Sequence, residues 1–375
     1  MKTRIALVRQ AGVPRPYDQT RPIAVVEADL AAPGPGELVV KIAAAGLCHS
    51  DLSVINGDRP RGMPVALGHE ASGVVQSVGP NVTRFAPGDH VVLVFAASCG
   101  HCLPCAEGRP ALCEPALSAA VAGSLITGSQ CISHQGQVIN HHIGVSGFAD
   151  YAVVSEASVV KIDRSIPLDR AALLGCAVLT GVGAVLNTGN LRAGQTCAVV
   201  GLGGVGLAAL LGAIAAGARE VIAVDLAEDK RAFAMELGAT HAVNPADPDA
   251  IAALRDRTGG GVDLAVEVAG AVPALKFAYD ITRRGGTTVT AGLPNPQAKL
   301  EIPAVSLTLG EQTLKGSYVG SCVPTRDIPR FAAMMMRGQL PIERLMTHRI
   351  TLDQINEGFE RLAKGQAIRQ VIVFD

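Results

Sequence analysis

Residues 196–225 read TCAVVGLGGVGLAALLGAIAAGAREVIAVD, and this stretch decides the fold. The apolar run Cys197–Val200 predicts a buried strand, which leads into GLGGVG at Gly201–Gly206, a G-x-G-x-x-G pattern. An Ala- and Leu-rich helix follows, and a second strand, Glu220–Val224, ends on Asp225. Strand, glycine turn, helix and acidic strand end together form the fingerprint of a dinucleotide-binding fold.

Each glycine at a fixed position of the pattern has a separate physical role. Gly201 permits the tight turn, Gly203 lets a pyrophosphate approach the backbone, and Gly206 allows close packing of helix on strand. The helix N-terminus presents unpaired N–H groups to the phosphates. We expect Asp225 to accept hydrogen bonds from the adenosine ribose. Because Leu226 rather than an arginine follows it, NAD is favoured over NADP.

The same stretch permits two other interpretations. Ala198–Ala218 carries no charge over 21 residues, which is long enough to cross a bilayer. Its glycines fall at the fingerprint positions, however, and another strand–helix pattern follows, so a membrane span is disfavoured. A glycine-rich turn that binds no ligand is disfavoured for the same reason.

Composition argues against several classes of function. The chain has 375 residues, enough for two domains, and a formal net charge of −1, so nothing favours nucleic acid or an acidic membrane surface as a partner. Aromatic residues are few and tryptophan is absent, which argues against base-stacking surfaces. The first ten residues lack a long apolar core, so we expect a cytoplasmic protein. Nine cysteines then indicate metal ligands or free thiols rather than disulfides.

The chain up to about Val178 has the pattern of a β-rich domain. Short β-branched runs are separated by Pro/Gly turns such as Pro33–Gly36. The expected strands are Ile5–Val8, Ala24–Glu27, Leu38–Ala43, Gly73–Val78, His90–Val94 and Tyr151–Val154. This pattern predicts a small, partly open β-barrel.

Between residues 179 and 320 strands alternate with helices, which predicts a doubly wound parallel sheet of the Rossmann type. The expected strands are Cys197–Val200, Val221–Val224, His241–Val243, Asp263–Val266, Thr287–Thr290 and Thr313–Ser317, and the expected helices are Leu207–Ala216, Glu228–Leu237, Asp249–Asp256 and Ala274–Thr282. The tail is predicted to form helices at Ile328–Arg337 and Leu352–Ala363 and a last strand, Gln370–Phe374, which returns to the β-rich domain. The predicted domains are therefore 1–178 with 321–375, and 179–320.

A loop of four cysteines predicts one metal site. Cys99, Cys102, Cys105 and Cys113 form a C-x2-C-x2-C-x7-C cluster. Four thiolates on one loop match a tetrahedral structural zinc site. An iron–sulfur cluster is the alternative, because three cysteines at this spacing also occur there. His101 would be a fifth ligand for four places, so we expect it to be exposed.

Residues far apart in the chain indicate a second metal site. Cys48 follows the strand Leu38–Ala43, His69 and Glu70 follow a proline-containing turn, and Cys176 precedes the alternating region. Two thiolates and an imidazole would leave a fourth zinc position open, which is the catalytic pattern. The spacing does not itself bring these side chains together, and Cys176 taken alone is typical of a buried core thiol.

The chain resembles the zinc-containing medium-chain alcohol dehydrogenases over essentially its whole length. The resemblance rests on Cys48-His49-Ser50-Asp51, Gly68-His69-Glu70, the four-cysteine loop, Cys176 and GLGGVG. It is greatest to the branch that holds the dimeric animal enzymes and the class III, glutathione-dependent formaldehyde dehydrogenases. It implies a GroES-like barrel domain, two zinc ions per chain, NAD, alcohol–aldehyde interconversion and, from the extra loop within Glu114–Val145, a homodimer.

The resemblance also implies a catalytic zinc held by Cys48, His69 and Cys176. Glu70 would lie behind the metal, Asp51 would orient the His69 ring, and Ser50 would take the alcohol proton. Four cysteines, Cys99, Cys102, Cys105 and Cys113, would hold the structural zinc.

Ten residues are implied to bind the cofactor. They are His49, Thr180, Gly201, Gly203, Gly204, Val205, Gly206, Asp225, Lys230 and Arg369. His49 and Arg369 would meet the pyrophosphate, Lys230 the adenosine ribose, and Thr180 and Val205 the nicotinamide. Without the resemblance, Lys230 and Arg369 are typical of solvated side chains.

Two positions depart from the family pattern. The family often has a histidine three residues after the serine, where this chain has Ser53, so the proton path beyond Ser50 stays open. Class III enzymes have an arginine where this chain has Leu117, which disfavours formaldehyde–glutathione activity. Phe95, Leu117 and Phe148 predict an apolar pocket for an uncharged alkyl or aryl alcohol. Class III activity, and a nucleotide-binding protein without turnover, are the alternatives.

Overall fold

The computed structural model describes residues 1–375, and the chain divides into two compact units. The first unit is Met1–Cys176 with Val323–Met336 and Met346–Asp375, and the second is Ala177–Cys322 with Arg337–Leu345. Residues 337–345, which the sequence assigned to the first domain, lie in the second unit. The reason is that the short turn η6 (Ile342–Leu345) packs on helix α7 (Gly204–Ala215) of that unit.

The first unit contains a β-barrel that is closed, where the sequence predicted a partly open one. Its strands, in the order in which they pair, are β1 (Lys2–Val8), β2 (Ile23–Leu30), β7 (Ile132–His134), β8 (Gln137–His141) and β4 (Val65–Ala66). The barrel encloses a small apolar core with Ile5, Leu7 and Ile139 fully buried. The sequence predicted the first two of these strands. It missed β4, β7 and β8, which are only two to five residues long.

A seven-stranded sheet forms the rest of the first unit's β-structure. Its pairing order is β10 (Val159–Lys161), β6 (His90–Val94), β5 (Glu70–Val78), β3 (Glu37–Gly46), β18 (Arg369–Val373) and β17 (Met346–Ile350), and β9 (Tyr151–Ser155) also pairs with β3. The last strand of the chain, β18, runs antiparallel to β3, with Ile372 opposite Ala45. The carboxyl-terminal strand therefore lies beside the strand that leads to Cys48.

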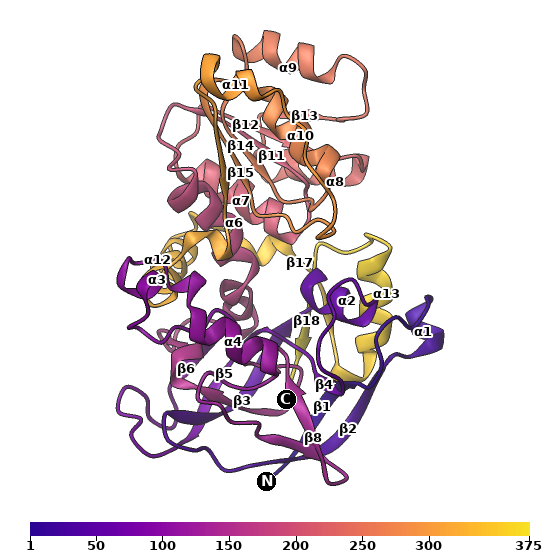
Figure 1. The fold of residues 1–375 in the computed structure, drawn as a ribbon, viewed down its shortest axis with the longest axis vertical. Helices are drawn as coiled ribbons and strands as arrows, with labels where there is room; N and C mark the ends of the chain where they lie inside the picture. The colour runs from indigo at the N-terminus through magenta and orange to yellow at the C-terminus, as the bar shows by residue number, and fades with distance from the viewer. The chain divides into compact units, whose positions relative to one another are not determined.

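The second unit is built on a six-stranded parallel sheet (Figure 1). Its strand order is β13 (His241–Val243), β12 (Glu220–Val224), β11 (Thr196–Val200), β14 (Val262–Glu267), β15 (Thr282–Thr290) and β16 (Thr313–Gly316). The crossover helices are α7, α8 (Glu228–Glu236), α9 (Ala250–Thr258) and α10 (Val272–Ile281). The order 3-2-1-4-5-6 is that of the doubly wound dinucleotide-binding fold, so the predicted fold class is confirmed.

The remaining helices are shorter than ten residues, except α12. They are α1 (Tyr17–Thr20), α2 (His49–Ile55), α3 (Leu103–Ala106), α4 (Glu114–Ala122), α5 (Leu168–Ala171), α6 (Ala177–Gly183), α11 (Ala304–Leu309), α12 (Pro324–Met336) and α13 (Ile355–Ala363), with single turns η1 (Pro110–Leu112), η2 (Glu156–Ser158), η3 (Ala172–Gly175), η4 (Ala184–Thr188), η5 (Val319–Ser321) and η7 (Leu352–Gln354). None of the helices, taken singly, has the length and apolar character to cross a bilayer; the bent pair Leu168–Gly175 and Ala177–Thr188 meets that criterion by length and composition alone.

Candidate active site and metal centres

Three segments of the first unit bring two thiols and an imidazole together. Cys48 lies between β3 and α2, His69 lies just before β5, and Cys176 follows η3. The ligand atoms of these three residues and of Glu70 all lie within 4.8 Å of one another. His69 Nε2 is 3.3 Å from Cys176 Sγ, and the three side chains are buried. The structure thus brings together the expected catalytic ligands.

Two glycines let the backbone reach this arrangement. Gly68 has φ +99°, and a Cβ there would lie 2.3 Å from the backbone nitrogen of Phe148. A Cβ on Gly175 would lie 2.4 Å from the carbonyl oxygen of Leu93 on β6. Both contacts are closer than a side chain tolerates, so only glycine at these positions allows the backbone to place His69 and Cys176 as it does.

The donor set fits a zinc ion. A tetrahedral zinc with ordinary bond lengths holds sulfur and nitrogen ligands about 3.6 Å apart, close to the observed separation. The Cys176 thiol lowers the pKa of Cys48 well below its usual value despite burial. Burial lowers the pKa of His69, but the neighbouring Asp51 carboxylate outweighs burial and raises this pKa well above its usual value. Two thiols and one imidazole nitrogen, all buried and close together, are thus the kind of donor set that a zinc ion binds.

Asp51 lies behind His69 as expected. Its Oδ2 is 3.0 Å from His69 Nδ1, and both side chains are fully buried. Burial opposes ionisation, but the neighbouring rings of His69 and His142 outweigh it and lower the pKa of Asp51 to about 2. The carboxylate is therefore ionised, and its contact with Nδ1 leaves Nε2 to face the thiols.

His142 is a neighbour of this site that sequence reasoning missed. Its Nδ1 lies 3.0 Å from Asp51 Oδ1, and its ring meets the His69 ring edge-on at 5.6 Å. It follows the short barrel strand β8 and lies 91 positions after Asp51 in the chain. The pair His141-His142 was a visible signal, but nothing in its spacing relates it to Asp51.

Glu70 has a buried partner that the sequence assigned elsewhere. Arg369 was expected at a pyrophosphate, but in the structure its guanidinium lies 3.2 Å from Glu70 Oε2 and donates to the Leu47 carbonyl at 3.1 Å. Both side chains are at most 4% exposed. Burial raises the pKa of Glu70 to about 7, and Arg369 offsets only part of that rise. The guanidinium thus provides the positive charge next to this carboxyl.

Ser50, which was expected to take the alcohol proton, lies in the first turn of α2 beside His49, which was expected at the pyrophosphate. Ser50 is half-buried, with its Oγ 3.9 Å from Cys48 Sγ, and His49 is exposed. The hydroxyl of Ser53 donates to the carbonyl of His49 at 2.8 Å. Its proton is therefore engaged within the helix, so Ser53 does not extend the path from Ser50 as a histidine would.

The three residues expected to form an apolar pocket have different environments. The Phe95 ring meets the His69 ring edge-on at 5.2 Å, which puts it at the site. Leu117 lies on α4 and is 67% exposed. Phe148 is fully buried and packs against Phe359 in the core of the first unit, with ring centroids 6.1 Å apart. Its backbone closes on Gly68, next to His69, and its assignment to the pocket stays a prediction.

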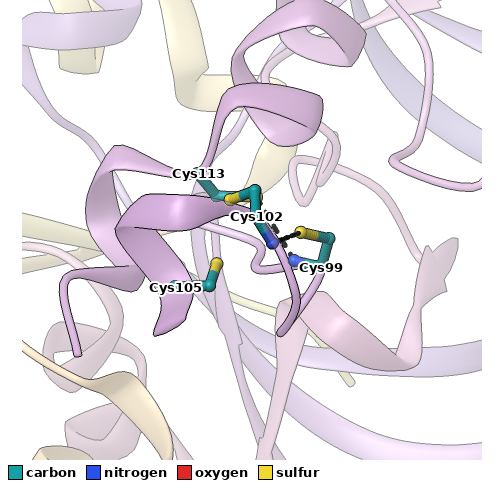
Figure 2. A group of neighbouring side chains, drawn as sticks. All are labelled: Cys99, Cys102, Cys105 and Cys113. Carbon is teal, nitrogen blue, oxygen red and sulfur yellow. Dashed lines mark hydrogen bonds between the residues drawn. The ribbon is translucent and has the colours of Figure 1, made fainter. Parts of the chain in front are cut away.

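The four-cysteine loop forms a second candidate metal centre. The sulfurs of Cys99, Cys102, Cys105 and Cys113 all lie within 4.8 Å of one another, as Figure 2 shows. Cys99 and Cys102 precede α3, Cys105 lies in it, and Cys113 lies between η1 and α4. The N–H groups of Cys99 and Cys102 donate to the sulfurs of Cys113 and Cys99 at 3.2 and 3.3 Å. The N–H of His101 lowers the pKa of Cys99 to about 6. These donors suit thiolates bound to a metal, and the His101 side chain is exposed, as expected.

In the second unit the glycine turn has the form that a dinucleotide needs. A Cβ on Gly206 would lie 1.8 Å from the Gly201 carbonyl, whereas a Cβ on Gly203 would meet nothing within 4 Å. Gly204 begins α7 immediately after this open position, so the first N–H groups of the helix are presented there. The close contact holds the turn, and the open one leaves room beside the helix N-terminus.

Asp225 is fixed at the end of β12. Its carboxylate accepts the N–H of Leu202 at 2.7 Å and the N–H of Ala227 at 2.9 Å. Each oxygen keeps a second lone pair for a ribose hydroxyl. Lys230 is half-buried on the first turn of α8.

The two residues expected at the nicotinamide come from adjacent helices. Thr180 lies in α6 and Val205 in the first turn of α7, and both are half-buried. A Cβ on Gly181 would lie 2.3 Å from the Val205 carbonyl. This close approach puts Thr180 beside the glycine turn.

Comparison with known proteins relates these features to a family. Residues 34–164 match the model of the alcohol dehydrogenase GroES-like domain, and residues 204–337 match the model of zinc-binding dehydrogenases. The NDMA-dependent alcohol dehydrogenase of Amycolatopsis methanolica is 40% identical over 377 residues, which cover 100% of this chain and 99% of that protein. Alcohol dehydrogenase class-3 of Drosophila melanogaster is 36% identical, with 96% of each chain covered. The crystal structure of benzyl alcohol dehydrogenase from Acinetobacter calcoaceticus matches with a TM-score of 0.93 and 32% identity over 100% of both chains.

Proposed function

The chain belongs to the zinc-containing medium-chain alcohol dehydrogenases, and from this premise we propose that it transfers a hydride reversibly between an uncharged alcohol and NAD. The observation that carries the proposal is the buried Cys48–His69–Cys176 constellation, with Asp51 3.0 Å behind the imidazole. Three protein ligands that leave one position open are the pattern of a catalytic rather than a structural zinc. A catalytically silent nucleotide-binding protein would have no need of this set.

The proposed chemistry divides the work between metal and protein. Zinc held by Cys48, His69 and Cys176 would act as a Lewis acid and lower the pKa of the alcohol. Ser50, in the first turn of α2 next to Cys48, accepts the alcohol proton. Because Ser53 is hydrogen-bonded to the His49 carbonyl, the proton passes from Ser50 to solvent rather than along the helix.

The choice of NAD is supported by Asp225. The backbone N–H groups of Leu202 and Ala227 hold its carboxylate in place at the end of β12. A 2′-phosphate would face this fixed negative charge, whereas two ribose hydroxyls can donate to it. We therefore expect affinity for NAD to exceed affinity for NADP.

The proposed substrates are alkyl or aryl alcohols without charge. Phe95, against the His69 ring, supplies apolar surface at the site, and the benzyl alcohol dehydrogenase is a structural relative that covers the whole chain. The class-3 relative favours a second candidate, glutathione-dependent formaldehyde oxidation. Leu117 argues against it, because an apolar side chain cannot pair with a carboxylate of the glutathione conjugate.

One experiment separates these possibilities. The purified protein, with its zinc quantified, is assayed with benzyl alcohol, primary alkanols and S-hydroxymethylglutathione, each with NAD, with NADP, and with NDMA in place of added coenzyme. We expect about two zinc ions per chain and turnover of simple alcohols with free NAD. Turnover of S-hydroxymethylglutathione alone would favour the class III activity. Turnover with NDMA but not with added NAD would contradict the proposal that free NAD accepts the hydride. Absence of zinc would contradict the proposed mechanism.

The assembly and location are also proposals. We propose a homodimer in the cytoplasm, with the edge strand β16 and the neighbouring helix α11 as the shared surface. β16 is the last strand of the sheet, and Val305, Leu307 and Leu309 of α11 are exposed apolar side chains. An uncovered edge strand beside exposed apolar residues favours association. Light scattering on the eluting protein measures the mass, and a monomer at micromolar concentration would refute the dimer.

A further inference from the structure

The carboxylate of Asp51 is contacted from three directions. The N–H of Gly68 donates to Oδ1 at 3.1 Å, His142 Nδ1 lies 3.0 Å from the same oxygen, and His69 Nδ1 lies 3.0 Å from Oδ2. Asp51, His69 and His142 are all buried. One oxygen of the carboxylate accepts the Gly68 N–H and lies against the His142 ring, which restricts rotation and keeps the second oxygen beside the His69 ring.

His142 is itself held firmly by the chain around it. Its backbone N–H lies 3.2 Å from the carbonyl of Ala66 on β4 and 3.1 Å from the hydroxyl of Ser146, and that hydroxyl donates to the same carbonyl at 2.9 Å. Its ring stands at 84° to that of His69, with centroids 5.6 Å apart. The barrel therefore fixes the imidazole that contacts Asp51.

We propose that His142 is a positioning residue for the catalytic zinc. It holds Asp51 so that the carboxylate keeps His69 Nδ1, and with it the direction of Nε2 toward Cys48 and Cys176. The inference rests on the proposed function, because it needs zinc at these ligands. It adds a residue of the barrel, which contributes no ligand, to the group that sets the affinity of the metal.

The proposal predicts how substitutions at position 142 change zinc affinity. Loss of a partner behind a metal-bound histidine typically costs 10–100-fold in affinity. His142→Leu removes one contact of Asp51 but leaves Asp51 itself, so it should raise the dissociation constant of the catalytic zinc by about tenfold, the lower end of that range. His142→Asn should retain most of the affinity, because its amide nitrogen occupies the place of Nδ1. His142→Gln puts its amide farther out and should resemble His142→Leu.

A matched control lies next in the chain. His141 is equally buried, but its Nε2 accepts the N–H of Cys131 inside the barrel. His141→Leu should therefore leave zinc affinity unchanged while it perturbs the barrel as much as a change at position 142 does. Thermal unfolding of the zinc-free forms shows whether each variant folds.

In the experiment, the full-length protein competes with a chelating dye for zinc. Two zinc-binding steps are expected, and the step that Cys48→Ser removes is the one that belongs to the catalytic site. The expected result is weaker binding for His142→Leu and His142→Gln, and binding within about threefold of wild type for His142→Asn and His141→Leu. His142→Leu within threefold of wild type, or His142→Asn as weak as His142→Leu, would overturn the inference. If Cys48→Ser shows the same zinc-binding steps as wild type, the proposed function itself is contradicted.

Discussion

The glycine turn of the second unit allows folding and cofactor binding to be separated by two alanine substitutions. At Gly206 an added Cβ would lie 1.8 Å from the Gly201 carbonyl oxygen, and real Cβ contacts essentially never fall below 3.0 Å. The turn between β11 and α7 would have to open by about 1.2 Å. At Gly203 the added Cβ meets nothing within 4 Å, and the backbone there, at φ −78° and ψ −172°, suits alanine.

The expected magnitudes follow from these contacts. Overpacking a rigid turn costs about 1–3 kcal/mol or more, so Gly206→Ala should lower the unfolding midpoint by roughly 2–12 °C for a unit of this size. Gly203→Ala should leave the free energy of unfolding within about 0.5 kcal/mol of wild type. Its methyl group, however, occupies the space that the pyrophosphate needs, so the dissociation constant of NAD should rise at least tenfold, or about 1.4 kcal/mol.

Two measurements check this prediction. Differential scanning fluorimetry compares the unfolding midpoints of the zinc-loaded variants, and isothermal titration calorimetry gives their NAD affinities. The reasoning is refuted if Gly203→Ala binds NAD as tightly as wild type, because the open space would then not be the pyrophosphate position. It is also refuted if Gly203→Ala is destabilised as much as Gly206→Ala.

Three further predictions concern the first unit. Cys48→Ala should abolish alcohol turnover and remove one zinc per chain while calorimetry still detects NAD binding, and retained turnover would exclude this site. Cys105→Ser should remove the other zinc and lower the unfolding midpoint by roughly 8–16 °C, if loss of the metal costs about 4 kcal/mol, with turnover at 25 °C preserved. Hydrogen bonding to Arg15 lowers the pKa of Glu360 to about 2, so its stabilisation is complete above pH 4.5 and is lost as the pH falls toward 2. Glu360→Gln should therefore flatten the acid limb of a pH–stability curve, and an unchanged limb would contradict this role of the pair.

The second unit was predictable from the sequence because its signals are local. Its central strands β11 and β12 are short and mostly apolar, and a helix follows each strand before the next parallel strand begins. Glu220–Val224 was read correctly as a strand because the glycine turn and helix before it leave one arrangement. Asp225 could be assigned by its distance from the turn alone.

The first unit was less predictable because its contacts are between distant residues. The strands β7 and β8 have three and five residues, and their pairing depends on the barrel rather than on an alternating pattern. The contact between Asp51 and His142 depends on that barrel. The full burial of Phe148 could not be predicted, because an aromatic residue near a predicted site can line a pocket or belong to the core. Its neighbour Gly68 was visible in the sequence, but not the close approach of the two backbones.

The metal site of the first unit is a consequence of strand register. Ile372, Ala45, Ala71 and Leu93 lie in one row across β18, β3, β5 and β6. Arg369 lies three residues before the first, Cys48 three after the second, and His69 two before the third, while Gly175 packs on the carbonyl of the fourth and so sets Cys176. A slip of one residue in any pair would turn the attached side chain to the opposite face. Motifs that are separated by up to about 320 residues therefore meet because four strands share one register, and this is information that no single motif carries.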